Sequence, residues 1–385
     1  MSPATGKYVP LLPEKKQGEK RASVHGAVFN VSTSIIGAGI MSIPATLKVL
    51  GVIPALVLIM IIAWLVDISV EFLLRYTQSG ESTTYAGVMR EVFGRVGSVS
   101  VQICVIITNL EWFGIHWWNS RAFALLFVVI LVMLPLVLIR RVESLRFSSA
   151  ISFLLAVIFV GICSVMAIHA LIEGKTKTPR LLPHLDNKTS FLNLFTAVPV
   201  IVTAFTFHFN VHPISSELAK PSDMISAVKI SLLLCAGIYF TTGIFGYLLF
   251  GESIVADILV NFDLSLIQQS VHYSMTQSDL AMPFTSCWPS LEKDSIRFVS
   301  LTLVLLVFAY LAAIAIPNIW YFFQFMGSTS AVCLAFIFPG AIVLRDVHSI
   351  STTRDKIAAA VMIILAVTTS TIALSTNIYI LVRNK

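Results

Sequence analysis

A segment near the start of the chain combines glycines with polar side chains inside an otherwise apolar run. From Asn30 to Pro44 it reads Asn-Val-Ser-Thr-Ser-Ile-Ile-Gly-Ala-Gly-Ile-Met-Ser-Ile-Pro. The two glycines weaken a helix because glycine has the most conformational freedom to lose. In a bilayer, backbone groups released from helical hydrogen bonds are tolerated only where they line a cavity or a ligand site. The segment therefore predicts a broken helix at a binding site. Close packing of helices around the glycines is the alternative explanation.

The segment from Val198 to Pro213 carries a second group of unusual residues. It places His208, Asn210 and His212 between two prolines within an apolar run. Such polar groups are costly in hydrocarbon unless protein partners or water satisfy them, and proline interrupts helical hydrogen bonding. We therefore expect a second broken helix. Two discontinuous helices that meet near the bilayer midplane are typical of transporters with inverted repeats.

The two ends of a broken helix offer opposite partial charges. A half-helix that begins near Gly39 would present free N–H groups and the positive end of its dipole to a carboxylate. The carbonyl end of the preceding half-helix, near Ser34 to Ile36, would suit an ammonium group or a cation. A zwitterionic α-amino acid satisfies both ends, so the sequence predicts an amino acid site.

The whole chain has the composition of a membrane protein. Of its 385 residues, 57% are hydrophobic and 12% charged, whereas soluble domains carry about 25% charged residues. Nine uncharged stretches meet or approach the roughly 20 residues that a helix needs to cross a bilayer. They are Ala22–Leu47, Val52–Val66, Ala122–Ile139, Phe147–Leu171, Phe191–Val211, Ile230–Phe250, Phe298–Pro317, Ile319–Leu344 and Ile357–Val382. The stretches are continuous, whereas the strands of a membrane barrel alternate, so we expect an all-α integral membrane protein.

The distribution of charge predicts how the chain sits in its membrane. The net charge of +6 could suggest nucleic acid, but the basic residues gather at the ends of the spans, as cytoplasmic loops require. Residues 1–21 would then form a cytoplasmic N-terminal tail. The loop from Glu173 to Ser190 would lie on the opposite face, where Asn187-Lys188-Thr189 matches the N-glycosylation pattern.

Four stretches resemble one known family, the amino acid/auxin permeases. They are Val28–Ser32, Ile36–Pro44, Phe205–Glu217 and Phe325–Thr329. The chain looks most similar to the sodium-coupled neutral amino acid transporters of animals and the vacuolar amino acid transporters of plants. The resemblance implies a five-plus-five inverted-repeat, LeuT-like fold with an extra C-terminal helix. The first repeat would cover about 22–172, the second about 191–345, and the final helix about 357–382.

The resemblance also implies roles for individual residues. The expected substrate-binding residues are Ser34, Gly37, Ala38, Gly39, Ile40, Met41, Phe207, His208 and Asn210. The expected ion-coupling residues are Asn30, Thr33, His208 and His212. Histidine is included because its ordinary pKa, about 6.5, suits proton coupling. We expect H+ or Na+ as the coupling ion, with no resident cofactor or metal.

Two places depart from the family's pattern. Gly97 to Leu110 runs directly into Glu111-Trp112-Phe113, and fourteen residues of helix reach only about 21 Å, so the third helix looks truncated. The eighth helix is not readable, because Gly251 to Glu292 is rich in polar residues. An alternatively spliced or frameshifted product would explain both departures.

These observations favour secondary active transport of amino acids, and of neutral ones in particular, coupled to protons or sodium. The alternative is a transport-impaired isoform that acts as a regulatory or amino-acid-sensing membrane protein. An enzyme is not expected, because the chain has no His-Glu-x-x-His, Gly-x-Ser-x-Gly or Cys-x-x-Cys pattern. The expected partners are an amino acid and the lipid bilayer, without nucleic acid. The membrane would be vacuolar or another endomembrane, or the plasma membrane.

Overall fold

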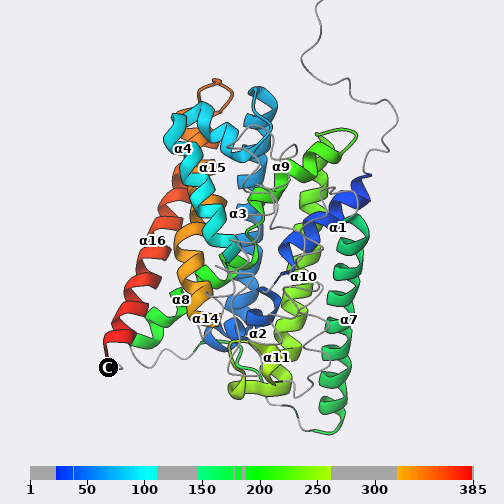
Figure 1. Ribbon diagram of the computed structural model, residues 1–385. Coiled ribbons are helices and arrows are strands. Elements are labelled where there is room, and N and C mark those ends of the chain that lie inside the picture. Colours follow the sequence, from blue (N-terminus) through cyan, green and yellow to red (C-terminus); the bar gives the residue numbers. More distant parts are fainter. Residues whose placement is uncertain are drawn as a thin grey trace, which may run out of the picture.

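The computed structural model describes residues 23–110 except Ala38, 145–183 except Lys175 and Lys177, 188–261, and 319–383. The regular structure in these ranges is helical, and the helices lie side by side in one bundle (Figure 1). The α-helices are α1 (Val24–Ile35), α2 (Gly39–Leu50), α3 (Val52–Ser79), α4 (Tyr85–Leu110), α7 (Leu145–Ile172), α8 (Lys188–Ala204), α9 (His208–Glu217), α10 (Asp223–Phe250), α11 (Ile258–Asn261), α14 (Ile319–Met326), α15 (Phe338–Arg345) and α16 (Thr353–Arg383). A 3₁₀ turn, η4 (Gly251–Ser253), follows α10, and two π-helical turns, η6 (Gly327–Ala331) and η7 (Cys333–Ile337), join α14 to α15.

Seven spans in the described ranges are long and apolar enough to cross a membrane. They are Val52–Ser79, Tyr85–Thr108, Ser152–Ile172, Phe191–Glu217, Asp223–Ser253, Trp320–Arg345 and Thr353–Tyr379. The pair α1 and α2, bent by 58°, passes the same test when taken as one span. The chain is therefore an all-α, multi-pass membrane protein, as the composition predicts.

Helix α4 is a candidate span that the nine uncharged stretches did not include. It covers Tyr85 to Leu110 and is interrupted at Gly94, so the part after the interruption runs from Arg95 to Leu110. The truncation of the third helix stays a prediction, because residues 111–144 lie outside the described ranges. Arg90 and Arg95 interrupt the apolar pattern, and the helix bends at Gly94, whose φ of 67° lies in the left-handed region that favours glycine. This span was therefore missed among the nine uncharged stretches.

Some predictions fall on residues outside the described ranges. These are the spans Ala122–Ile139 and Phe298–Pro317, the glycosylation acceptor Asn187, and most of the segment in which no eighth helix could be read. Of that last segment, the structure describes only η4 and α11.

Helix α10 holds the bundle together, because it packs against α1, α2, α3 and α7. Small residues allow its close approach to α2: a Cβ added to Gly243 would lie 2.8 Å from Leu47, and one added to Gly246 would lie 3.0 Å from Pro44. Helix α8 packs against α2, α14 and α16. These contacts place α1 and α2, on either side of Gly37, next to α8 and α10.

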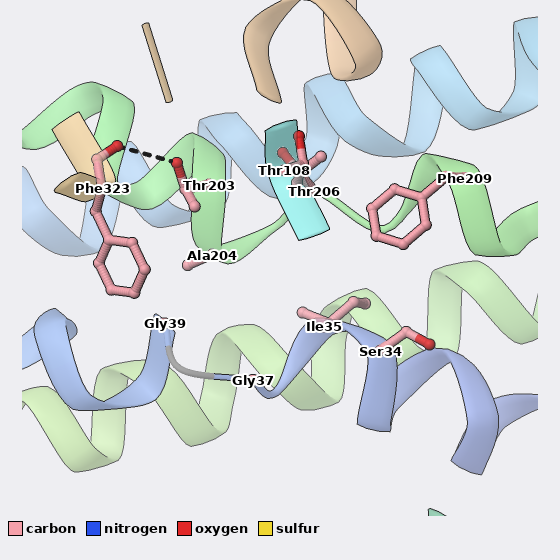
Figure 2. Close-up of a pocket in the computed structure, with 10 residues that line it drawn as sticks. All are labelled: Ser34, Ile35, Gly37, Gly39, Thr108, Thr203, Ala204, Thr206, Phe209 and Phe323. Atoms are coloured by element: carbon pink, nitrogen blue, oxygen red, sulfur yellow. Dashed lines mark hydrogen bonds between the residues drawn. The ribbon is translucent and has the colours of Figure 1, made fainter. Parts of the chain in front are cut away.

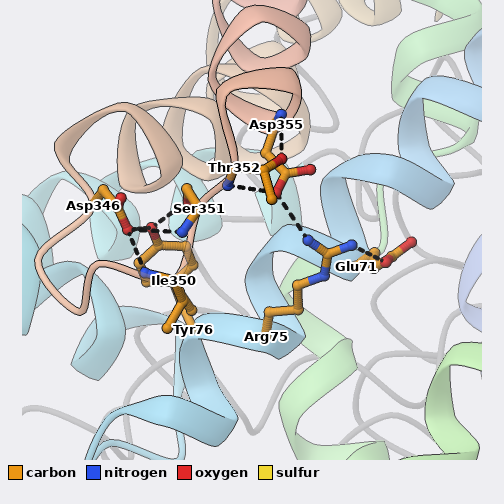
Figure 3. Close-up of polar contacts among 8 residues, drawn as sticks. All are labelled: Glu71, Arg75, Tyr76, Asp346, Ile350, Ser351, Thr352 and Asp355. Atoms are coloured by element: carbon orange, nitrogen blue, oxygen red, sulfur yellow. Dashed lines mark hydrogen bonds and ion pairs between the residues drawn. The ribbon is translucent and has the colours of Figure 1, made fainter.

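One end of the bundle is tied together by polar contacts between α3 and the turn that joins α15 to α16 (Figure 3). Tyr76 donates to the Asp346 carboxylate at 2.6 Å, and the same carboxylate receives Lys356 at 3.0 Å. Arg75 bridges Glu71 and Asp355. The Tyr76 hydrogen bond, together with Lys356 and backbone N–H groups, lowers the pKa of Asp346 below its ordinary value.

The opposite end of α3 is tied by a different set of contacts. Arg180, in the segment between α7 and α8, donates to both carboxylate oxygens of Glu252, at 2.8 and 2.6 Å. The Val52 N–H, at the start of α3, donates to the Arg180 carbonyl at 3.0 Å. The hydrogen bond with Tyr247, followed by the interactions with Glu252, raises the pKa of Arg180. Between these two ends lie the breaks in the helices.

Candidate functional site

The first break separates α1 from α2. Helix α1 ends at Ile35 and α2 begins at Gly39. Beyond α1 the backbone tightens, because the Ile36 N–H donates to the Ser32 carbonyl and the Gly37 N–H donates to the Ile35 carbonyl, both at 2.8 Å. The predicted interruption is therefore present at the glycine pair.

The second break separates α8 from α9. Helix α8 ends at Ala204 and α9 begins at His208. The Thr206 hydroxyl donates back to the Val202 carbonyl at 2.7 Å, which satisfies one of the carbonyls at the end of α8. The two prolines of this segment lie within α8 and α9, not at the break.

A small cavity, partly open to solvent, lies between the two breaks. Figure 2 shows Gly37 on the segment that joins α1 to α2, opposite the end of α8. The lining residues are Ser34, Ile35, Gly37, Gly39, Thr108, Thr203, Ala204, Thr206, Phe209 and Phe323. The two broken segments therefore supply eight of these ten residues, with α4 and α14 supplying one each.

The predicted substrate residues are divided between the cavity lining and its surroundings. Ser34, Gly37 and Gly39 line the cavity. Asn210 does not line it, but its amide donates to the Ser34 hydroxyl across the gap at 3.3 Å. The remaining predicted residues Ile40, Met41, Phe207 and His208 are buried beside the lining, and Ala38 lies outside the described ranges.

The two histidines face α3 and do not line the cavity. His208 Nε2 lies 3.1 Å from the Ser69 hydroxyl, and His212 Nε2 lies 2.7 Å from the Thr77 hydroxyl. The His212 ring also stacks on Tyr85, with 6.1 Å between centroids. In both histidines Nδ1 is buried without a hydrogen bond to any described residue.

The predicted cation ligands lie on α1, just before the break. Asn30 Oδ1 is buried and has no hydrogen bond within the described part of the chain. The Thr33 hydroxyl donates to the Phe29 carbonyl at 2.8 Å, and the Ser34 hydroxyl donates to the Asn30 carbonyl at 2.9 Å. The amide oxygen of Asn30 is therefore an acceptor that no described residue uses, and oxygen ligands of this kind suit a hard cation.

Several lining residues were missed by the sequence analysis. Thr108 and Phe323 come from helices that carry no glycine or proline signal at those points. Thr203 precedes the second break and Thr206 lies within it, in the segment that was singled out for its histidines and prolines. The available signal was a hydroxyl inside an apolar run, but serine and threonine are common there because they can bond to their own helix.

The chemistry of the lining is uncharged. None of the ten residues is acidic, basic or histidine, so the charge complementarity available comes from helix ends. A negative partial charge of about half an elementary charge lies at the carbonyl ends of α1 and α8. A positive partial charge of similar size lies at the N–H ends of α2 and α9. Such a cavity suits a molecule that carries both an ammonium and a carboxylate.

Comparison with known proteins agrees with this geometry. The family model described as transmembrane amino acid transporter protein matches residues 20–381. The chain belongs to this family. It is thus a membrane transporter and not an enzyme.

Relatives match along nearly the whole chain. Amino acid transporter AVT6C of Arabidopsis thaliana is 54% identical over 430 residues, covering 97% of this chain and 98% of the relative. Amino acid transporter AVT6A of the same plant is 40% identical, covering 97% and 95%. Sodium-coupled neutral amino acid transporter 7 of Danio rerio is 22% identical, covering 83% and 78%.

The alignment with AVT6C is longer than the chain itself. It extends over 430 positions, whereas the chain has 385 residues, so at least 45 positions of the relative have no counterpart here. The chain thus lacks material that this relative has within the aligned region.

Proposed function

We propose that this chain carries out secondary active transport of neutral amino acids and binds them in the cavity between the two breaks. The observation that supports this proposal most strongly is the cavity lining, which joins two interrupted helices and whose described residues include no ionisable side chain. A charged substrate side chain would find no counter-charge there, and an unpaired charge in such a site is costly. A neutral amino acid leaves only its ammonium and carboxylate to be satisfied.

The helix ends suggest how the substrate is oriented. The N–H groups at the start of α2, near Gly39, would receive the carboxylate. The carbonyls at the end of α1, near Ile35, would receive the ammonium. The Ser34 hydroxyl, which Asn210 holds from the other side, would select for the polar end of the substrate. In this arrangement the five-plus-five inverted repeat would place both breaks at the bilayer midplane.

Coupling to a cation is part of the proposal. Asn30 and Thr33 would contribute to a sodium site just before the first break. His208 and His212, each with a buried Nδ1 that lacks a described partner, would instead serve proton coupling. Replacing both histidines with glutamine should flatten the pH dependence of uptake. A pH profile of unchanged shape would show that the histidines are structural.

The proposed orientation follows from the positions of the basic residues. Arg75, Lys356 and the α15–α16 turn lie at one end of α3, and positive charge favours the cytoplasmic side. This end and residues 1–21 would be cytoplasmic, in a vacuolar membrane, another endomembrane or the plasma membrane. Labelling a cysteine introduced at Ser349 from each side of sealed vesicles would test the orientation.

Uptake of radiolabelled L-alanine and L-glutamine into proteoliposomes tests the proposed function. We expect accumulation that depends on an inward proton or sodium gradient and that collapses with an ionophore for the coupling ion. Equal uptake with and without gradients would contradict coupling. Preference for lysine or glutamate would contradict the neutral specificity.

A second candidate function is favoured by the difference in length. The missing 45 or more positions would weaken transport if they include parts of the third or eighth helix. The chain would then bind amino acids and act as a regulatory or sensing protein. Binding of L-alanine without measurable uptake, and uptake restored by inserting the corresponding AVT6C segments, would support this candidate.

A further inference from the structure

One hydroxyl group joins the ends of the two broken helices. Tyr239, on α10, lies with its hydroxyl oxygen 2.6 Å from the Ile35 carbonyl, at the end of α1. The same oxygen lies 3.0 Å from the Ala204 carbonyl, at the end of α8. The side chain is fully buried, and its ring meets Phe205 edge to face, with 5.2 Å between centroids. Both carbonyls belong to residues that line the cavity.

We propose that Tyr239 is a positioning residue that clamps the carbonyl ends of α1 and α8 and thereby sets the width of the amino acid site. This inference rests on the proposed function of the cavity. Tyr239 does not line the cavity, so it would act through the two carbonyls and not by touching the substrate.

The clamp follows from the hydrogen-bonding needs of helix ends. The last carbonyls of a helix have no donor within their own helix, and leaving them unsatisfied in a buried site is costly. The Ile35 carbonyl also accepts the Gly37 N–H, at 2.8 Å. A hydroxyl on α10 that can donate to either end removes this cost only while both carbonyls stay within hydrogen-bond distance of the same oxygen. The hydroxyl therefore fixes the separation of two segments that are far apart in the sequence.

Gly39, at the start of α2, packs closely against both the end of α8 and the Tyr239 hydroxyl. A Cβ added there would lie 2.6 Å from the Ala204 Cβ and 3.2 Å from the Tyr239 hydroxyl. The start of α2, the end of α8 and the tyrosine thus meet at one point. Little room is left for the two breaks to move relative to each other while the hydroxyl is in place.

The hydroxyl has one proton for two carbonyls. Whichever carbonyl receives that proton, the other keeps acceptor capacity for a further donor. The ammonium group of an amino acid in the cavity would supply such a donor. The clamp would therefore hold one carbonyl in place for the substrate while it satisfies the other.

The test compares two tyrosines of the same helix. Tyr239→Phe removes the hydroxyl and keeps the ring against Phe205. Tyr247→Phe is the matched control, because its hydroxyl bonds to Glu252 and Arg180 at the end of α10 and not to either break. The binding of L-alanine and L-glutamine to each purified full-length variant is measured from the rise in Tm with ligand concentration.

We expect the Kd of Tyr239→Phe to rise about tenfold, as the loss of a buried hydrogen-bonded group allows, and its KM for uptake to rise by more than its kcat falls. Tyr247→Phe should lower the ligand-free Tm comparably but leave Kd unchanged. Unchanged Kd in folded Tyr239→Phe, or the same rise in Tyr247→Phe, would overturn the inference.

Two further outcomes keep the test decisive. If Tyr239→Phe does not fold, Tyr239→Gln replaces it, because the glutamine amide keeps N–H donors but has a shorter reach than tyrosine. Wild-type affinity for L-alanine in Tyr239→Gln would overturn the clamp. Weakened affinity would support it. If the wild-type chain binds neither amino acid, the proposed function fails, and the inference fails with it.

Discussion

The two breaks face each other across one cavity, yet they are built in different ways. The first lies at a glycine pair, where the backbone itself is free to leave the helix. The second, from Phe205 to Phe207, contains no glycine, and both phenylalanines are fully buried. It is held by the Thr206 hydroxyl, by packing and by Tyr239. The first break is therefore sensitive to added volume, and the second to lost hydrogen bonds.

The largest effect is expected from adding volume at the first break. Gly39→Ala places a Cβ 2.6 Å from the Ala204 Cβ and 2.9 Å from its Cα, so backbone must move. Overpacking of this kind costs about 1–3 kcal/mol of stability. We expect L-alanine binding to weaken by at least about tenfold, which corresponds to 1.4 kcal/mol. The structure indicates that the loss comes from separating α2 and α8, in addition to any direct contact of Gly39 with substrate.

The control for this prediction is another glycine of a spanning helix. A Cβ added to Gly161, on α7, would meet nothing within 4 Å. Gly161→Ala should keep both Tm and affinity. Wild-type affinity in Gly39→Ala would show that close packing of the breaks does not shape the site.

A smaller effect is expected from removing a hydrogen bond at the second break. Thr206→Val keeps the shape of the side chain and removes the hydroxyl that bonds to the Val202 carbonyl. A hydrogen bond of this type contributes about 0.5–1.5 kcal/mol, so we expect Kd to rise by about threefold to tenfold. The binding isotherm of Thr369→Val, whose hydroxyl bonds within α16, serves as the reference. Equal affinities in Thr206→Val and Thr369→Val would show that the Thr206 hydrogen bond does not shape the amino acid site.

The smallest effect on binding is expected far from both breaks, at Asp346. Its φ of 45° suits asparagine as well, so Asp346→Asn keeps the turn and removes the charge. The folded pKa of Asp346 lies below its ordinary value. Its stabilisation is therefore present above the ordinary pKa of about 4 and is lost as the pH falls through the folded pKa. We expect Asp346→Asn to have a lower Tm at neutral pH and a Tm that depends less on acid pH. Its Kd for L-alanine should be unchanged. A changed Kd would mean that this turn is coupled to the cavity.

The sequence predicted the elements whose signals are local. The apolar stretches predicted most of the spans, and the glycine pair predicted the first break, because both properties follow from a few neighbouring residues. The second break was expected from His208, Asn210 and the prolines, but it lies at Phe205–Phe207. Part of what holds this break is not local, since the hydroxyl of Tyr239 on α10 lies 3.0 Å from the Ala204 carbonyl at the end of α8.

Local and non-local signals also separate the lining residues that were predicted from those that were missed. Ser34, Gly37 and Gly39 were predicted from one segment, and all three line the cavity. Thr108 and Phe323 reach the cavity only through the packing of α4 and α14, which no spacing in the sequence reveals. Helix α4 was not among the predicted spans for a local reason, because Arg90 and Arg95 interrupt its apolar pattern.

Protection of a single cysteine tests the central claim most directly. In a background without the five native cysteines, Ser34→Cys places a thiol on the cavity lining, and Thr83→Cys places one on the exposed turn between α3 and α4. With L-alanine at ten times its Kd, occupancy should slow thiol labelling of Ser34→Cys about tenfold and leave Thr83→Cys unchanged. Labelling of Ser34→Cys at the same rate with and without L-alanine, in protein that binds L-alanine, would place the amino acid site elsewhere and contradict the account.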